Sequence, residues 1–286
     1  MKRLLLVVVI FFIASSLLGC GMTQEMTQNN PEREKEFSVQ LLDKGEGGIE
    51  TIDFETISPY GSFISTDALE TVTVSFDGNT YTGTYRTTNH YPGTNLLIDE
   101  YYVDDSSLCS SFEVSREDQT LLGIDMVGGQ EFFASEFTRP ILSEEEIEQR
   151  AVSWASKWIL MDGYSSELDF RKGSEEASCP DLYCYRFCSI AQGIETTDYL
   201  DVLVSDRGTF YWMHALQPGW TKDHRAELLN FDVKEAIEQA KVASKLTNPV
   251  IGAQRFGLTE EGKVCLMVFL TGSDDEVPLL LGVSQE

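Results

Sequence analysis

The chain contains 286 residues, of which 42% are hydrophobic and 11% aromatic. This length suits one large domain or two ordinary ones, and the apolar content is enough for a folded core, which excludes a disordered or collagen-like chain. Lys and Arg number 21 against 47 Asp and Glu, so the formal net charge is −26. Such a surface repels nucleic acid and anionic lipid headgroups, and we therefore expect no nucleic-acid partner.

The first twenty residues have the pattern of an export signal. A short basic start, Met1-Lys2-Arg3, precedes an apolar run from Leu4 to Ala14, which is shorter than the roughly 20 residues of a membrane-spanning helix. The following Leu17-Leu18-Gly19-Cys20 resembles the lipobox of bacterial lipoproteins. The resemblance implies that residues 1–19 are removed and that Cys20 receives a diacylglycerol with acyl chains such as palmitate. The alternative is an ordinary secretory signal in which the cysteine is incidental.

Residues 20–35 are rich in Thr, Gln, Asn and Glu and lack apolar periodicity, which predicts a flexible tether between the lipid and the folded part. Loss of Lys2 and Arg3 with the signal peptide leaves 19 basic against 47 acidic residues, or −28. A body this acidic gains nothing electrostatically from an anionic membrane, so attachment must come from lipid. We expect a protein anchored to the cell membrane on its extracytoplasmic face.

The region 36–138 is predicted to be rich in strands. From Leu69 to Tyr85, β-branched and aromatic residues alternate with Thr and Ser around an Asp77-Gly78-Asn79 turn, the pattern of a β-hairpin. Further strands are expected at 96–103, 111–114 and 121–126. The region contains no long helical pattern, and the boundary with the next region is placed at Arg139-Pro140.

The region 141–286 is predicted to contain two helix-plus-hairpin units, at approximately 141–218 and 230–286. Each begins with a polar cap followed three residues later by Glu, at Ser143 and at Asp232. Apolar residues at helical spacing follow each cap, and Trp154 and Trp158 are expected to pack into the core of the first unit. The predicted fold class is α+β, with antiparallel sheets, two amphipathic helices packed on them, and a mostly β N-terminal part.

The order of elements in these units resembles the PepSY-like extracytoplasmic domains of bacterial lipoproteins. The residues that carry the resemblance are 141–146, opening a helix, then Tyr185-Arg186-Phe187, 193–198 and 201–208. The similarity covers about 143–214, and 232–270 more loosely, and it is interrupted by the segment 171–181. It implies a binding, inhibitory or regulatory role at the cell surface and no catalytic residues.

Five cysteines lie outside the predicted anchor: Cys109, Cys179, Cys184, Cys188 and Cys265. An odd number leaves at least one thiol unpaired. Cys184 and Cys188 are four residues apart in a predicted strand, about 13 Å, which is too far for a disulfide. The spacing from Cys179 to Cys188 lacks the Cys-x2-Cys element of zinc sites, so no metal is expected. Buried thiols are predicted, with a Cys179–Cys184 disulfide as the alternative.

No motif for a hydrolase, a phosphate-binding loop or a cofactor is present in the sequence. The histidines His90, His214 and His224 are scattered, and His214 is interpreted as structural or exposed. Acidic clusters at 99–100, 104–105 and 274–276 lack the ligand spacing of a calcium loop and are interpreted as a solvated acidic surface.

We therefore expect a non-catalytic protein without cofactor or metal, whose predicted modification site is Cys20. Its expected partners are the membrane, through the lipid, and a protein or peptide of the cell surface. Exposed strand edges offer a route for binding an extended segment. The alternatives are a hydrolase whose site forms from residues distant in sequence, and a solute-binding lipoprotein of an import system.

Overall fold

The fold is described from a computed structural model, for residues 36–44, 62–104, 108–126, 136–159, 161, 163–172, 180–273 and 276–286. These all belong to one compact unit, Lys35–Glu286. The predicted signal peptide (1–19), the tether (20–35), Cys20 and Cys179 lie outside the described residues.

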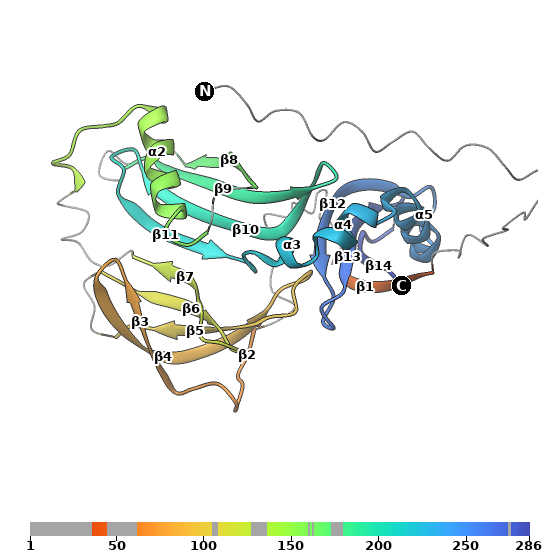
Figure 1. The fold of residues 1–286 in the computed structure, drawn as a ribbon, viewed down its shortest axis with the longest axis horizontal. Coiled ribbons are helices and arrows are strands. Elements are labelled where there is room, and N and C mark those ends of the chain that lie inside the picture. Colours follow the sequence, from red (N-terminus) through yellow and green to blue (C-terminus); the bar gives the residue numbers. More distant parts are fainter. Residues whose placement is uncertain are drawn as a thin grey trace, which may run out of the picture. The chain divides into compact units, whose positions relative to one another are not determined.

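Strands are the predominant secondary structure of the described chain (Figure 1). The strands are β1 (Phe37–Lys44), β2 (Ser62–Phe63), β3 (Thr71–Phe76), β4 (Asn79–His90), β5 (Leu97–Tyr102), β6 (Ser111–Ser115), β7 (Leu121–Asp125), β8 (Tyr164–Lys172), β9 (Leu182–Ala191), β10 (Ile194–Ser205), β11 (Phe210–Ala215), β12 (Val250–Leu258), β13 (Val264–Thr271) and β14 (Leu279–Gln285). The helices are α2 (Glu144–Ala155), α3 (Trp220–Asp223), α4 (Arg225–Asn230) and α5 (Val233–Ser244).

The described strands form one mixed 14-stranded sheet, so the predicted α+β class is wrong. The sheet runs in the order β1-β14-β13-β12-β10-β11-β7-β6-β5-β4-β2; in addition, β3 pairs with β4, β9 pairs with β10, and β8 pairs with β9. The helices are few and short, and they do not organise separate antiparallel sheets as predicted.

Two pairings between distant segments join the parts that the sequence suggested were separate. β11 pairs antiparallel with β7 through Trp212 and Asp125, which connects the N-terminal strands to β8–β11. β10 pairs with β12 through Thr196 and Phe256, and this contact is parallel. The fold-class prediction failed because local alternation identifies a strand without identifying its neighbour in the sheet.

β1 was not predicted from the sequence, and it pairs with the far end of the chain. Phe37 is opposite Gln285, and the pairing continues to Lys44 opposite Leu279, with a register shift between Leu41 and Asp43. Phe37 also packs edge-on against Phe231, with ring centroids 6.3 Å apart. Residues 37–44 therefore complete the C-terminal part of the sheet.

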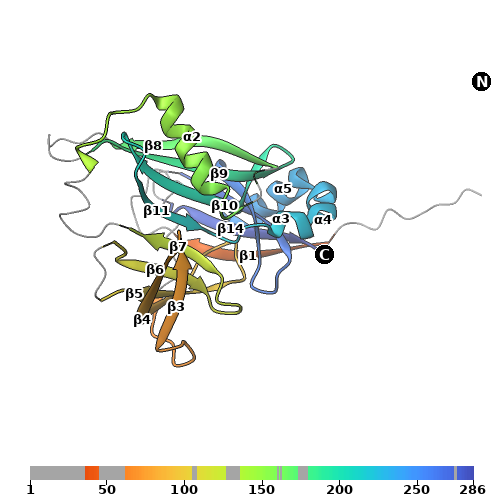
Figure 2. The same cartoon turned by 60° about the vertical axis from the view of Figure 1, so that its left-hand side comes forward.

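α2 packs against β9 and β10 and closes the largest core cluster (Figure 2). Its predicted capping box is confirmed: Ser143 Oγ accepts from the Glu146 amide at 3.3 Å, and the Glu146 carboxylate accepts from the Ser143 amide at 2.9 Å. Ile147, Ala151 and Ala155 are buried. Trp154 and Trp158 are partly buried at the border of this core, where both indoles stack on Phe76 of β3.

α5 packs against β13, β14 and β1 and covers the second core cluster. The predicted N-cap is confirmed, because Asp232 Oδ1 accepts from the Glu235 amide at 3.1 Å. Ala236 and Ala240 are fully buried, and their small side chains let the helix approach the sheet closely. None of the helices in the described ranges is long and apolar enough to cross a bilayer.

Candidate functional site

The structure places the three histidines in different polar settings. His90 Nε2 lies 3.2 Å from the Thr94 carbonyl oxygen. His224 Nδ1 lies 3.0 Å from Glu227 Oε1, within one turn of the α3–α4 segment. His214, on β11, lies with its Nε2 3.7 Å from Glu113 Oε2, which is beyond a hydrogen bond. His214 belongs to a larger arrangement of charged groups.

That arrangement is a row of residues at matching register across five strands, which we term the polar row. Arg186 is opposite Asp201, Asp201 opposite His214, His214 opposite Gly123, and Gly123 opposite Glu113. The chain neighbours of these residues point to the other side of the sheet and belong to the largest core cluster: Phe187, Val202, Met213, Ile124 and Phe112. The polar row therefore lies on the face opposite that core.

A buried ion pair forms one end of the polar row. Arg186 Nε donates to Asp201 Oδ1 at 2.8 Å, and Arg186 Nη2 donates to Asp201 Oδ2 at 2.7 Å. Arg186 is 8% exposed and Asp201 6%. Both carboxylate oxygens are thus occupied by one guanidinium in the two-point geometry typical of strong charge-assisted pairs.

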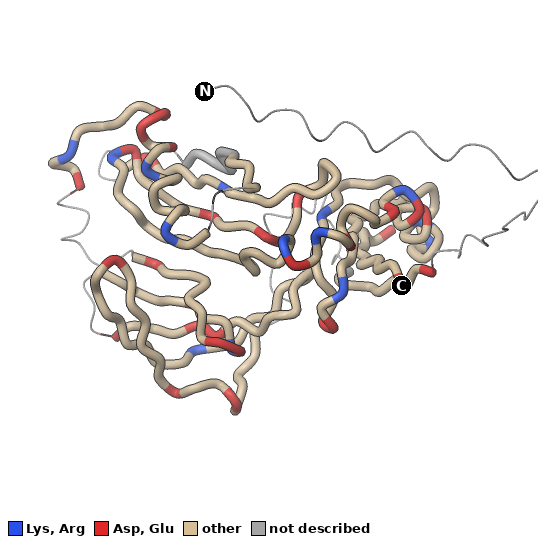
Figure 3. The backbone as a smooth tube through the Cα atoms, viewed as in Figure 1, with Lys and Arg blue, Asp and Glu red and all other residues tan. Residues whose placement is uncertain are grey.

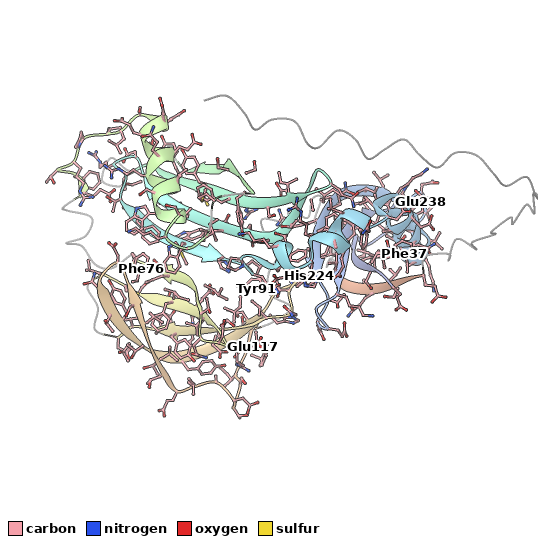
Figure 4. The ribbon with its side chains drawn as sticks, viewed as in Figure 1. Phe37, Phe76, Tyr91, Glu117, His224 and Glu238 are labelled. Atoms are coloured by element: carbon pink, nitrogen blue, oxygen red, sulfur yellow. The ribbon has the colours of Figure 1, made fainter. Side chains whose placement is uncertain are left out.

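Glycine at position 123 lets Glu113 reach across β7 toward His214. A Cβ at Gly123 would lie 2.5 Å from Glu113 Oε2, so any larger residue would displace the carboxylate. The ring of Tyr91, which Figure 4 labels, lies beside that of His214, with the two ring centroids 5.6 Å apart and the planes tilted by 56°. Burial, together with the nearby Glu113 charge, raises the pKa of the Tyr91 phenol, which therefore stays neutral.

A small cavity beside Arg186 is also lined by Ser165, Cys188, Ile190 and Glu195. Its volume is about 10 Å³, room for about one water molecule. The basic groups around it are paired, Arg186 with Asp201 and Arg255 with Glu195 at 2.6 Å. Both guanidinium groups also lie near the Tyr199 ring, at 4.6 and 5.6 Å from its centroid. This cavity is too small for a substrate.

Other buried carboxylates hold the fold together. Asp198, which is fully buried, accepts hydrogen bonds from the Gly219 amide at 2.7 Å, from Thr221 Oγ1 at 2.6 Å and from the Tyr164 hydroxyl at 2.5 Å. It therefore fixes the start of α3 against β8 and β10. Asp99, 1% exposed, forms an ion pair with Arg116, whose Nε donates to Asp99 Oδ2 at 3.0 Å.

The four described cysteines, Cys109, Cys184, Cys188 and Cys265, are buried, as predicted. No group of three or more His, Cys, Asp or Glu side chains suited to a metal ion occurs within the described ranges.

Cys188 and Cys265 should resist alkylation in the folded protein. Burial raises the pKa of the Cys188 thiol to about 11 and that of Cys265 to about 12, so neither forms the reactive thiolate at pH 8. Iodoacetamide at pH 8, followed by peptide mass spectrometry, should label both only after unfolding in guanidinium. In the unfolded chain the pKa of each thiol is near 9, below its value in the folded protein. The contribution of these two buried thiols to the free energy of unfolding is therefore present below pH 9 and should be lost as the pH rises from about 9 toward 12. Labelling of native Cys265 would contradict this.

The sheet also presents strands that have a neighbour on one side only. In the described part of the chain these are β1, β2, β3 and β8, which pair with β14, β4, β4 and β9 respectively. An edge strand exposes amide and carbonyl groups to which another extended chain can add. Along these edges of the described sheet, main-chain groups have no neighbouring strand.

Comparison with known proteins gives no family assignment. No protein-family model matches the sequence, and no curated protein matches it. Among solved structures, the chain is similar to the Bacillus megaterium YpeB C-terminal domain, at 12% identity over 73% of this chain and 88% of that one, with a TM-score of 0.29. Values this low define neither the fold nor the function.

Sequence reasoning missed the polar row and interpreted His214 as structural or exposed. The side chain is 23% exposed and packs between Glu113 and Tyr91. No local signal could have located the row, because its members lie on five strands and meet only through the pairing of the sheet. The isolated glycine in the β7 sequence was the one available hint of a close approach.

Proposed function

We propose that the protein is a lipid-anchored, non-catalytic binding protein on the extracytoplasmic face of the cell membrane. The observation that carries the binding role is the open sheet, with edge strands at its ends. Buried charges described above are engaged with partners inside the fold, as in the Arg186–Asp201 pair, and the cavity beside that pair has room for only about one water. Main-chain pairing needs none of these groups.

The anchoring part of the proposal rests on Leu17-Leu18-Gly19-Cys20 and the apolar run before it. Between Cys20 and the first strand lie the 16 residues 21–36. Fully extended, they would span at most about 55 Å, which is enough to hold the sheet clear of the bilayer surface. The PepSY-like resemblance of 143–214 and 232–270 supports the same role at the cell surface.

The charge of the body favours partners with basic groups. Acidic residues are distributed over several parts of the described backbone (Figure 3), and in the whole sequence 47 Asp and Glu outnumber 21 Lys and Arg. Attraction over the surface is screened beyond about 8 Å at physiological ionic strength, so binding should weaken as salt is added.

The proposed lipid anchoring is tested by measuring whether Cys20 is lipidated. In a bacterial expression host fed an alkyne analogue of palmitate, the wild-type chain should become labelled and remain in the membrane fraction. Cys20→Ser should be unlabelled and leave that fraction, whereas Cys109→Ser, which changes a buried cysteine of the folded part, should be labelled like the wild type. Mass spectrometry of an unmodified Cys20 in the mature chain would overturn the anchoring.

The absence of catalysis is tested with the same purified chain. Panels of peptide, ester and glycoside substrates should show no turnover above the rate without protein. Turnover that is abolished by changing one acid, serine or histidine would replace this proposal with a hydrolase. Tight retention of a small solute would instead favour the import-system alternative.

A further inference from the structure

We propose that the outer edge of β3 binds an extended segment of a partner protein, one that alternates hydroxyl and β-branched residues and carries a basic residue at each end. This inference deepens the proposed function, on which it rests, by naming the edge and the chemistry of its occupant.

The β3–β4 hairpin fixes which amides of β3 face outward. Asp77 and Gly78 both have positive φ, 47° and 81°, as a two-residue type I′ turn requires. The pairs continue without interruption from Phe76–Asn79 to Thr71–Thr84. Because hydrogen-bonded and non-hydrogen-bonded pairs alternate from the turn, Phe76, Val74 and Val72 bond to β4. The main-chain groups of Thr71, Thr73 and Ser75 point to the open side.

β3 is the one regular edge among the four in the described sheet. β1 has a register shift between Leu41 and Asp43, and β8 has one between Leu168 and Phe170. β2 is only two residues long. Irregularities and short length are the devices by which edge strands avoid unwanted pairing. β3 has six residues, no bulge, no proline and no charged residue, so it is the edge best formed to accept another strand.

The exposed face of the hairpin specifies hydroxyl residues in the partner. Thr71, Thr73 and Ser75 are exposed, and each lies opposite an exposed threonine of β4: Thr84, Thr82 and Thr80. The hydroxyls of Thr73 and Thr82 are 2.8 Å apart. A partner strand with hydroxyl residues on this face would extend the same cross-strand pairing by one more strand.

The opposite face of β3 is apolar and specifies β-branched residues at the alternate positions. Val72 and Val74 are 9% and 8% exposed, and Phe76 is 5% exposed. Phe76 stacks on Trp154 and Trp158 with centroids 5.8 and 5.3 Å apart. Apolar side chains of an added strand would continue this surface and lose further contact with water.

Charge at the two ends of β3 selects a basic partner and opposes a second copy. Glu70 is exposed before the strand, and Asp77, whose side chain is 53% exposed, follows it and pairs with Lys157 at 2.8 Å. Antiparallel pairing of β3 with itself, centred on Thr73, would place Glu70 of each copy opposite Phe76 of the other, one residue from its Asp77. Two chains of net charge −26 would also repel each other.

The test uses the full chain purified in detergent and a fluorescent peptide, acetyl-Lys-Thr-Val-Thr-Val-Thr-Lys-amide, followed by fluorescence anisotropy. In antiparallel register its three threonines face Ser75, Thr73 and Thr71, and its lysines lie near Asp77 and Glu70. N-methylation of the central threonine removes an amide directed at β3 and should weaken binding about tenfold or more. N-methylation of a valine, whose amide points away, should change the affinity by less than about threefold.

Variants of the protein give the matched comparison. Thr73→Pro removes an outward amide without removing a bond to β4, and edge strands tolerate proline, so the fold should persist while affinity falls about tenfold or more. Thr73→Val keeps the amide and should bind within about threefold of the wild type. Hydrogen exchange gives a second measurement: the peptide should protect the amides of Thr71, Thr73 and Ser75, and leave those of Val72 and Val74 unchanged.

Several outcomes would overturn the proposal. Equal binding to wild type and Thr73→Pro, equal effects of the two N-methylations, or no binding at all would each do so. Dimerisation of the wild type that Thr73→Pro abolishes would assign the edge to a second copy instead. If the peptide does not bind while Cys20 carries lipid, the proposal of binding at the β3 edge is wrong and the proposal of lipid anchoring stands. If Cys20 is not lipidated and the peptide still binds, the proposal of lipid anchoring is wrong and the proposal of binding at the β3 edge stands.

Discussion

Asp201→Ala should lower the free energy of unfolding by about 3–5 kcal/mol, the cost typical of removing one partner of a buried ion pair. Asp201 receives two hydrogen bonds from Arg186, at 2.8 and 2.7 Å, and both residues are less than a tenth exposed. The variant leaves the guanidinium of Arg186 buried without the carboxylate that neutralises it. Urea unfolding followed by tryptophan fluorescence measures the loss.

The control for Asp201→Ala removes both charges together. Arg186→Met with Asp201→Leu replaces the pair by apolar side chains of similar volume and should be less destabilised than Asp201→Ala, because no charge remains buried. Glu238→Ala, at an exposed pair with Lys241, should change stability by less than about 1 kcal/mol. A loss of under about 1 kcal/mol for Asp201→Ala would show that the Arg186 charge is readily hydrated in the variant, and our account of the polar row would be wrong.

A stabilising role for the Arg186–Asp201 pair bears on the proposed function. Charges that neutralise each other within the sheet fix its register and leave no strong field for a small charged ligand at that point. Under the proposed function, binding would then depend on the main-chain groups at the edges of the sheet. The β3–β4 pairing has no register shift, so the outward main-chain groups of β3 are evenly spaced. The β1 and β8 edges each have a register shift, which interrupts that spacing.

The elements predicted correctly from the sequence are those whose signals are local. The capping box of Ser143 and Glu146 and the cap of Asp232 depend on residues three apart, and both helices begin where predicted. The hairpin at Asp77-Gly78 follows from two residues that accept positive φ between alternating strands. In each case the chemistry that forms the element lies within a few residues.

The features that were not predicted depend on contacts between distant segments. β1 pairs with β14 across the whole length of the described chain, and the parallel pairing of β10 with β12 joins two parts of the sheet at a single bridge. Alternating apolar residues indicate that Phe256 is buried, but they do not identify Thr196 as its neighbour. The polar row arises from the same long-range pairings, which is why the sequence did not suggest it.

Gly257→Ala should lower the free energy of unfolding by about 1–3 kcal/mol, the usual cost of forcing an extra carbon into a packed interior. Gly257 lies in β12, opposite Cys265 of β13. A Cβ there would lie 2.7 Å from the carbonyl oxygen of Gly93 and 2.8 Å from its Cα. These are main-chain atoms, so no side chain can rotate away to make room.

The local contacts of Gly93 explain why the segment cannot move aside cheaply. Its carbonyl accepts hydrogen bonds from the Leu258 amide at 2.8 Å and from Thr197 Oγ1 at 2.9 Å. Gly93 itself has φ of 75°, a conformation that few other residues adopt. The loop after β4 is thereby fixed on β10 and β12, next to the parallel bridge of Thr196 and Phe256.

Two effects of opposite sign meet in Gly257→Ala, and their sizes decide the result. Alanine restricts the unfolded chain and would stabilise the protein by about 0.4–1 kcal/mol if the site were open. The steric cost is larger, so the net change should be destabilising, with a fall in Tm of about 2–4 °C for each kcal/mol. Hydrogen exchange of the Leu258 amide should accelerate more than that of amides in the β3–β4 hairpin, because the displaced bond is local. An unchanged Tm with unchanged protection of Leu258 would mean that the loop and β12 separate without cost, and that Gly93 does not fix the junction.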